Sequence, residues 1–350
     1  MPKPHSGGSS VPMLLPAIIL MAGLSSPAQR PSVAAGAEQA GRRVVTYQVV
    51  HGWPELPPGE ILGQATGVDI DSQGNVLVFH RAGRTWTEPF PAEPIARPTV
   101  WVFHGKTGRL LRSWGAGVFV MPHGLTVDHD DNVWLTDVGL HQVFKYAADG
   151  RLLLKLGQAR TPGADESHFN LPTDVAVLKD GSFFISDGYE NTRVVKFAAD
   201  GAFLLSWGTP GKGPGQFNLP HGIAADASGH VFVADRGNSR VQVFDGSGRF
   251  LAEWHGPDVG RPYAVALDPD GKAFVADGGD QPAEPPDRAA VAVLDRDGKV
   301  LMRFGRFGNY DGQFRIAHDI AVGPDGAVYV VDAWGQRVQK FLPQWEDAAE

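Results

Sequence analysis

The sequence contains no cysteine, and this absence excludes several kinds of structure and chemistry. Disulfide frameworks, thiolate zinc sites and cysteine nucleophiles all require the sulfur atom of cysteine. Any metal ion in this protein must therefore be held by histidine, by carboxylates or by backbone oxygen atoms.

Positive charge is also scarce, because 31 Lys and Arg residues stand against 39 Asp and Glu residues and the formal net charge is −8. A nucleic-acid binder needs a basic surface to neutralise phosphates, and this balance does not supply one. With 43% hydrophobic and 20% charged residues, the chain can bury a sizeable core. These numbers predict a globular protein that does not bind nucleic acid.

Long hydrophobic runs are limited to one stretch, residues 11–24, near the N-terminus. Lys3 precedes this stretch and the small residues 26–28 follow it, which is the pattern of an export signal. The stretch is short and poorly flanked for a membrane span, although an uncleaved anchor is the alternative. We expect a signal peptide over residues 1–28 and a linker over residues 29–42. The mature protein is then periplasmic or secreted and makes no contact with the membrane.

A repeated unit fills the rest of the chain and predicts its fold. Each copy contains short apolar runs that are separated by tight-turn pairs such as Asp-Gly, Asp-Asn or Ser-Gly, which is typical of β-hairpins. Successive copies begin 42 to 57 residues apart, close to the spacing of propeller blades. The six copies start at Gly67, Gly124, Asp174, Gly222, Ala264 and Asp319.

A fourth apolar run follows each of the first five copies, whereas the sixth copy has none after Phe341. The stretch 44–50, which precedes the first copy, can supply the missing strand. The sequence therefore predicts an all-β fold, a six-bladed β-propeller over residues 43–345 that is closed by an N-terminal strand, with a C-terminal tail over residues 346–350. An open β-solenoid is the alternative, and it would not need the early strand.

Function must be sought where equivalent positions differ, because a propeller is only a scaffold. The first copy has His80, followed by Arg81, at the end of its second run, where the other five copies have aspartate. We interpret the shared aspartate as a residue that serves the blade by binding backbone amides in the following turn. These five residues are Asp137, Asp187, Asp235, Asp277 and Asp332.

Histidine alternates at the position just before the first strand of each copy. In chain order, this position holds Thr66, His123, Thr173, His221, Tyr263 and His318. Alternate blades of a closed six-bladed ring lie at about 120° to one another, so three equivalent side chains converge on the axis. Three neutral imidazoles with an open fourth position are a ligand set of catalytic zinc, and iron or manganese can also bind imidazole. The alternative is that each histidine only packs at the start of its strand.

Around these positions the chain resembles the peptidyl-α-hydroxyglycine α-amidating lyases, which are zinc enzymes on a six-bladed propeller of NHL-type repeats. The resemblance extends over about residues 67–341. The motifs that carry it are Gly67-Val68, Phe79-His80-Arg81 with Trp86, Pro122-His123-Gly124-Leu125, Ser186-Asp187-Gly188-Tyr189, Pro220-His221, Ala234-Asp235-Arg236 and His318-Asp319-Ile320.

The resemblance implies that His123, His221 and His318 bind zinc, in agreement with the alternation. It also implies that Tyr189 is the catalytic base and that two arginines line the substrate site, namely Arg81 and Arg236.

A structural calcium ion is implied as well, held by Asp319 and by the backbone carbonyls of Val68 and Leu125. One departure concerns the tyrosine loop, because animal members of the family have a disulfide beside the tyrosine whereas this chain has Glu190 there.

The activity implied by the resemblance is cleavage of the C–N bond of an α-hydroxyglycine-type substrate to an amide and glyoxylate. The residues outside the propeller are too few to form the copper monooxygenase domain that makes this substrate in animals, so we expect a separate substrate-generating enzyme as partner. Two alternatives stay open: another metal-dependent propeller enzyme, such as a lactonase or hydrolase that uses metal-bound water, and a non-catalytic NHL-type binding propeller.

Overall fold

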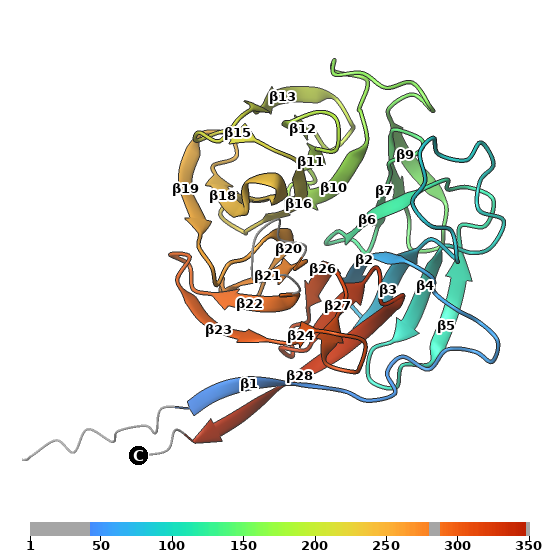
Figure 1. Cartoon of the computed structure of the whole chain (residues 1–350). Coiled ribbons are helices and arrows are strands. Elements are labelled where there is room, and N and C mark those ends of the chain that lie inside the picture. The colour runs from blue at the N-terminus through green and yellow to red at the C-terminus, as the bar shows by residue number, and fades with distance from the viewer. Residues whose placement is uncertain (1–42, 280–287, 348–350) are drawn as a thin grey trace, which may run out of the picture. The chain divides into compact units, whose positions relative to one another are not determined.

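The computed structural model describes residues 43–279 and 288–347. Within these residues, six four-stranded antiparallel sheets are arranged as blades around a central axis (Figure 1). The described elements are all strands except one short 3₁₀ helix, η1 (Arg236–Asn238). The prediction of an all-β, six-bladed propeller is therefore confirmed.

The first three blades follow one another along the chain, and their first strands lie innermost (Figure 1). Blade 1 contains β2 (Ala65–Ile70), β3 (Asn75–His80), β4 (Val100–His104) and β5 (Leu110–Trp114). Blade 2 contains β6 (Pro122–Val127), β7 (Val133–Asp137), β8 (Gln142–Tyr146) and β9 (Leu152–Leu156). Blade 3 contains β10 (Pro172–Val177), β11 (Phe183–Asp187), β12 (Arg193–Phe197) and β13 (Phe203–Trp207).

Blades 4 and 5 repeat this order, and each is flanked by a short parallel strand pair. Blade 4 contains β16 (Pro220–Ala225), β17 (Val231–Asp235), β18 (Arg240–Phe244) and β19 (Phe250–His255). Blade 5 contains β20 (Pro262–Leu267), β21 (Ala273–Asp277), β22 (Ala290–Leu294) and β23 (Val300–Phe304). The parallel pairs are β14 (Thr209–Pro210) with β15 (Gln216–Phe217), and β24 (Arg306–Phe307) with β25 (Gln313–Phe314).

Blade 6 is built from both ends of the described chain. It contains β26 (Ala317–Val322), β27 (Val328–Asp332), β28 (Arg337–Asp347) and β1 (Arg43–Val49). Strand β1 pairs antiparallel with β28, and Val49 lies opposite Phe341. The N-terminal strand thus closes the ring, as the sequence predicts.

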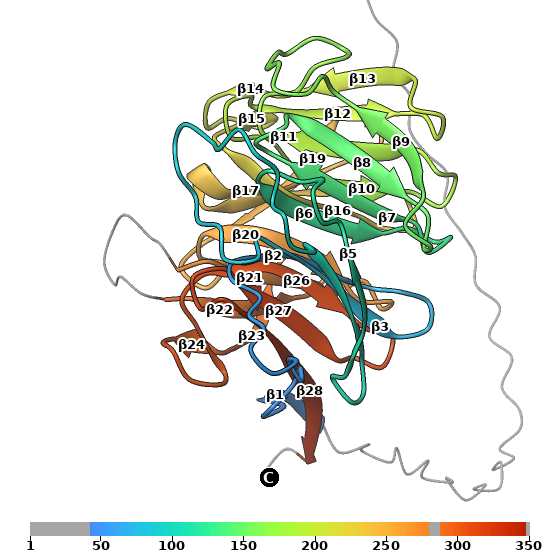
Figure 2. The ribbon, with the colours of Figure 1, turned by 90° about the vertical axis from the view of Figure 1, so that its right-hand side faces the viewer.

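Among the described residues, six hydrophobic clusters fill the interfaces between neighbouring blades, one cluster at each interface. Between blades 1 and 2, for example, Phe79 and Phe144 pack against Phe119 with ring centroids 4.9 and 5.4 Å apart. Each blade therefore buries both of its faces, and Figure 2 shows the sheets packed side by side in this way. This double burial explains why strands such as β7 and β17 are buried along their whole length.

Buried aspartates fix the segment that leads into each inner strand. Asp137, at the end of β7, accepts N–H hydrogen bonds of 2.6 Å from Val120 and 3.0 Å from Met121, which precede β6. It also accepts the N–H of Leu140 in the following turn, at 2.9 Å. The interpretation that these aspartates bind backbone amides of the following turn is confirmed, and they also accept hydrogen bonds from amides that precede the inner strand.

The predicted signal peptide, residues 1–28, and the predicted linker, residues 29–42, lie outside the described residues. In the part of the chain that is described, no helix has the length and hydrophobicity needed to cross a bilayer.

Candidate metal centre

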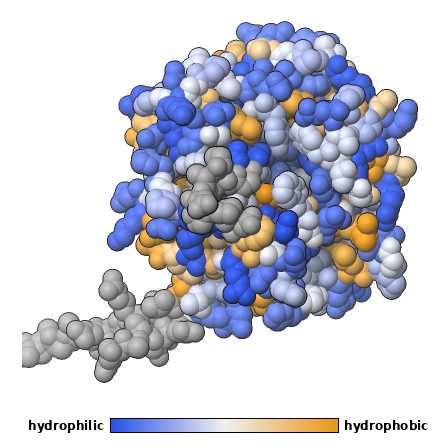
Figure 3. Space-filling model, viewed as in Figure 1, coloured by the Kyte–Doolittle hydropathy of each residue, from blue (hydrophilic) through white to orange (hydrophobic). Residues whose placement is uncertain are grey.

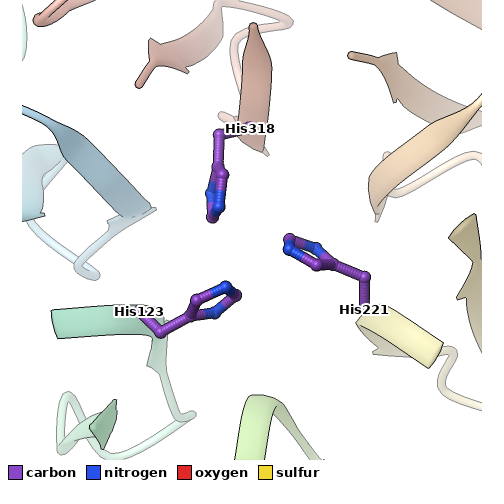
Figure 4. Close-up of side chains that lie close together, drawn as sticks. All are labelled: His123, His221 and His318. Carbon is purple, nitrogen blue, oxygen red and sulfur yellow. The ribbon is translucent and has the colours of Figure 1, made fainter. Parts of the chain in front are cut away.

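The inner strand of every blade begins with a β-bulge, and the bulge contains the residue at which the sequence alternates. In blade 2, the register between β6 and β7 shifts between Pro122 and Leu125, at the position of His123. A bulge re-aims a side chain out of the regular pleat and is frequent beside active sites. At the starts of β6, β16 and β26, the re-aimed side chain is a histidine that points to the axis (Figure 4).

The three imidazoles meet at the centre of the ring (Figure 4). One ring nitrogen from each of His123, His221 and His318 lies within 4.8 Å of the other two. The side chains are buried, with at most 7% of their surface exposed. Within residues 43–279 and 288–347, this is the one group of three or more histidine and acidic side chains with the spacing of a metal site.

The following blade fixes the orientation of each imidazole. In each case Nδ1 donates to a main-chain carbonyl oxygen: His123 to Thr173 at 2.7 Å, His221 to Tyr263 at 2.7 Å and His318 to Thr66 at 2.8 Å. Because a carbonyl oxygen can only accept, Nδ1 carries the hydrogen and Nε2 of the neutral ring keeps its lone pair. Histidines that bind metals almost always donate their other ring N–H in this way.

Two glycines allow the inner strands to approach closely at these hydrogen bonds. A Cβ atom on Gly124 would lie 2.5 Å from the carbonyl oxygen of Thr173, and one on Gly222 would lie 2.7 Å from that of Tyr263. These are the same oxygen atoms that accept the imidazole N–H groups. The glycine after the histidine in blades 2 and 4 is therefore needed for close packing of neighbouring blades.

Burial keeps the imidazoles neutral. It holds the pKa of His123 and His221 well below the usual 6.5, and repulsion by the neighbouring histidines and arginines lowers these pKa values further. Burial, reinforced by the charge of Arg81, lowers the pKa of His318 to about 3. The neutral imidazole is the form that binds metal ions, so the centre is ready for a metal at neutral pH.

Tyr189 brings a hydroxyl group to this centre from the turn after β11. Its Oη lies 3.1 Å from Nε2 of His123 and 3.3 Å from Nε2 of His221. The preceding residue makes this position accessible, because a Cβ atom on Gly188 would lie 1.6 Å from the carbonyl oxygen of Pro220. Any other residue at position 188 would therefore clash with this carbonyl oxygen.

Arg81 lies at the end of β3 in blade 1 and is buried. Its Nε donates to the carbonyl oxygen of Pro122 at 3.1 Å, and its Nη1 donates to the side chain of Gln64 at 2.6 Å. Its guanidinium carbon is 5.3 Å from the ring centroid of Trp86. Burial lowers the pKa of Arg81 to about 10, so the side chain is charged at neutral pH.

Arg236 approaches the centre from blade 4, at the start of η1. Its guanidinium carbon lies 3.8 Å from the ring centroid of Tyr263, and it donates a hydrogen bond to the hydroxyl of this tyrosine. The Tyr263 ring in turn lies 5.0 Å from that of His221. The structure thus places both sequence-predicted arginines beside the histidines, on opposed blades.

Further along the inner strands, three carboxylates surround a cavity of about 180 Å³. The cavity is lined by the residues predicted to hold calcium, Val68, Leu125 and Asp319, and also by Asp69 and Asp174. Asp319 Oδ2 accepts the N–H of Val68 at 2.9 Å. Burial raises the pKa of Asp69 to about 6, and burial together with Asp69 raises that of Asp174 to about 7.

Two features of this region could hardly be predicted from the sequence. The carboxylates of Asp69 and Asp174 stand out only as acidic residues inside otherwise apolar inner strands. The carbonyl groups that orient the imidazoles could not be predicted, because every residue carries a carbonyl group.

The chain is similar in sequence to proteins that contain NHL repeats. The NHL repeat model matches residues 169–197, 217–244 and 314–341. The chain is 36% identical over 329 residues to peptidyl-alpha-hydroxyglycine alpha-amidating lyase 1 of Drosophila melanogaster. The aligned region covers 85% of this chain and 60% of the fly protein. It is 30% identical over 325 residues to NHL repeat-containing protein 3 of Homo sapiens, which covers 85% of each protein.

The chain spans less than two thirds of the fly relative's length, as the 60% coverage shows. Among solved structures, a gluconolactonase of Xanthomonas campestris matches with a TM-score of 0.58 and 15% sequence identity, over 81% of this chain and 88% of that one. At this low identity, the match supports the propeller fold alone.

Proposed function

This chain belongs to the NHL-repeat protein family and has peptidyl-α-hydroxyglycine α-amidating lyases among its relatives, and we propose that it is itself a metal-dependent carbon–nitrogen lyase. The proposed substrate is a peptide or smaller N-acyl compound that ends in α-hydroxyglycine. The products are the free amide and glyoxylate. The observation that carries the proposal is the convergence of three imidazoles and one tyrosine hydroxyl on the axis of a propeller with these relatives.

The three histidines fit a divalent transition metal, and we assign zinc. Each ring is neutral and donates its Nδ1–H to a carbonyl oxygen, so Nε2 carries the lone pair that can coordinate the ion, and three imidazoles form a known ligand set of catalytic zinc. His123, His221 and His318 would hold the ion. When bound, zinc would act as a Lewis acid that lowers the pKa of the substrate hydroxyl.

Tyr189 is the group that we propose moves the proton. Its Oη, as phenolate, would accept the proton of the substrate hydroxyl. As this O–H bond breaks, a C=O bond forms, the C–N bond breaks and the nitrogen takes the electron pair. The same proton then passes from Oη to the nitrogen, so that one hydroxyglycine gives one amide and one glyoxylate without consuming water.

The two arginines would supply fixed positive charge on opposite sides of this reaction. Arg81 is buried and held by two hydrogen bonds, so its charge would stabilise a phenolate at Tyr189 with little loss to solvent screening. Arg236, on the opposite side, would bind the carboxylate of the substrate, which a guanidinium group can do with two hydrogen bonds.

We also propose that the carboxylate cavity holds a structural calcium ion through Asp319 and the backbone carbonyls of Val68 and Leu125. Buried carboxylates are costly unless a cation or hydrogen bonds compensate them, and calcium prefers oxygen ligands. A calcium-selective chelator should then lower the thermal unfolding midpoint while the zinc content stays constant. An unchanged midpoint would remove calcium from the proposal.

Export to the periplasm or the medium remains part of the proposal, supported by Lys3, the apolar stretch 11–24 and the small residues 26–28. A separate enzyme would generate the hydroxyglycine substrate. N-terminal sequencing of the protein recovered from the cell exterior tests the predicted cleavage after residue 28.

The lyase proposal is tested by purifying the protein without added metal, measuring its metal content and assaying glyoxylate release from an N-acyl-α-hydroxyglycine. We expect about one zinc ion per chain and release of glyoxylate and amide in equal amounts. Bound metal without glyoxylate would exclude this reaction and favour a hydrolase or lactonase. A metal-free protein would favour a binding propeller.

A further inference from the structure

A seventh hydrophobic cluster lies outside the six clusters between the blades. Its base consists of the buried residues Val120, Met121 and Val138 of blade 2. Half-buried side chains pack on this base, and Trp86 and Phe90 are the aromatic ones that precede it in the chain. We call these five residues the apolar wall.

The aromatic part of the wall belongs to a long connection, residues 81–99, between β3 and β4. Hydrogen bonds hold this connection against the segment that leads from β5 into β6: Arg84 Nη1 donates to the carbonyl of Val120 at 2.8 Å, and the N–H of Ile95 donates to the carbonyl of Phe119 at 2.7 Å. The connection is thus fixed at two points beside the start of blade 2.

The wall is continuous with the proposed catalytic centre through Tyr189. The ring centroid of Trp86 lies 5.1 Å from that of Tyr189 and 4.9 Å from that of Phe90. The hydroxyl at the other end of the Tyr189 ring is 3.1 Å from His123 Nε2. A molecule that reacts at the imidazoles is therefore separated from Trp86 by the width of one aromatic ring.

We propose that the half-buried rings of Trp86 and Phe90, which form the outer part of the apolar wall, bind the side chain of the residue that precedes hydroxyglycine in the substrate, and that they select aromatic and large aliphatic side chains there. The proposal rests on the proposed function for the identity of the reacting end. On the face of the molecule that Figure 3 shows, hydrophobic and hydrophilic residues are interspersed and form no single continuous hydrophobic surface.

The geometry supports this orientation of the substrate. The carboxylate of hydroxyglycine would face Arg236 of blade 4, whereas the acyl group leaves with the amide on the side of blades 1 to 3, where Trp86 and Phe90 lie. Burying a Phe or Leu side chain is worth enough to raise affinity by at least about tenfold over alanine. Acidic side chains would be disfavoured, because the wall would desolvate them without a partner.

The test is a binding measurement with two compounds that lack the hydroxyl and cannot react, N-acetyl-Phe-Gly and N-acetyl-Ala-Gly. Isothermal titration calorimetry should give a Kd ratio of at least about ten in favour of the Phe compound. In Phe90→Ala the ratio should fall below about three, and Phe90→Leu should restore most of it. Phe90 is the chosen position because Trp86 touches Arg81 and Tyr189 directly.

Trp334→Ala is the matched control. This tryptophan follows β27, at the same end of its blade as Tyr189 in blade 3, and 61% of its surface is exposed. It should leave the ratio unchanged. Equal Kd values in the wild type, or a preference that survives Phe90→Ala, would overturn the proposal.

Glyoxylate release from the hydroxylated counterparts separates this inference from the proposed function. A preserved Kd ratio without any glyoxylate would reject the lyase reaction and leave the wall in place as a binding site. Glyoxylate release without a Kd ratio would reject the wall and leave the lyase in place.

Discussion

The even-numbered and odd-numbered blades share one backbone design but contribute different atoms to the centre. Every inner strand starts with a bulge, yet blades 2, 4 and 6 place an imidazole there, whereas blades 1, 3 and 5 place a carbonyl oxygen that accepts the N–H of that imidazole. A six-fold scaffold thus produces a three-fold site. The comparison teaches that the odd blades are as necessary to the centre as the even blades, although their side chains differ.

The largest effect is expected from removing an even-blade ligand. His221→Ala leaves two imidazoles, which is fewer than a catalytic zinc site uses, so both bound metal and glyoxylate release should fall to background, a loss of at least about 10³-fold. Metal content and turnover are measured on the same preparation.

His255→Ala is the control for this variant, because His255 lies in the outer strand of the same blade with 67% of its side chain exposed. It should keep full metal content. Wild-type turnover by His221→Ala would show that the centre does not depend on three even-blade imidazoles.

The next largest effect concerns Tyr189 of blade 3, whose hydroxyl lies against the imidazoles. Tyr189→Phe removes only the hydroxyl that lies 3.1 Å from His123 Nε2, so metal content should stay constant. Turnover should fall by about 10²- to 10⁴-fold, the usual contribution of a positioned acid or base. Tyr310→Phe, at a tyrosine with 78% of its surface exposed, should have no effect. An unchanged rate in Tyr189→Phe would exclude this residue from proton transfer.

A smaller effect is expected from separating an even blade from the odd blade that follows it. In Gly222→Ala, the new Cβ would lie 2.6 Å from Cα of Ala264 and 2.7 Å from the carbonyl oxygen of Tyr263. The strands must move apart, so the free energy of unfolding should drop by about 1–3 kcal/mol. The hydrogen bond to His221 should weaken, and zinc affinity should fall by about 10- to 100-fold.

Urea denaturation and a zinc competition assay measure these two quantities. Gly246→Ala is the control in the same blade, because its Cβ would meet no atom closer than 3.4 Å. If Gly222→Ala bound zinc as tightly as the wild type, the carbonyl contact would not support the centre.

The smallest effect concerns blade 1, where His80 replaces the aspartate of the other blades. Its Nδ1 lies 2.6 Å from the carbonyl oxygen of Leu62, and burial lowers the pKa of His80 to about 4. The unfolded chain takes up a proton below pH 6.5, whereas the folded chain does so only near pH 4. Stability from this group is therefore complete above pH 6.5 and falls by about 1.4 kcal/mol per pH unit below it, or about 2 kcal/mol at pH 5.

His80→Phe retains an aromatic ring against Trp101, whose centroid lies 5.0 Å away in the wild type. Between pH 7 and pH 5, the free energy of unfolding of this variant, measured in urea, should decrease by about 2 kcal/mol less than that of the wild type. Parallel pH profiles would contradict the assigned burial of a neutral His80.

Much of this molecule follows from local sequence pattern. Turn pairs and apolar runs predict the strands because hairpin geometry is set by neighbouring residues, and the fourth apolar run predicted after the third copy forms β13. The alternation of His123, His221 and His318 predicts their convergence because equivalent positions in a closed ring are related by rotation. The structure brings these three side chains together, and Tyr189 with them.

Other parts of the site depend on distances that the sequence does not contain. Asp69 and Asp174 meet Asp319 at one cavity, although they come from blades 1, 3 and 6 and follow no alternation. Trp86 reaches Tyr189 because the connection 81–99 folds over blade 2 instead of extending into solvent.

The sequence by itself determined the repeat, the ring of six blades and the residue types at the bulges, because these follow from periodicity and from backbone geometry within each copy. Only the tertiary structure decided which atoms face each other between copies. It placed the carbonyl of Thr173 against His123 and the ring of Trp86 against Tyr189, since contacts across blade interfaces depend on how closely whole sheets pack. This packing determines the partners of main-chain groups and of long connections, and the residue pattern does not predict them.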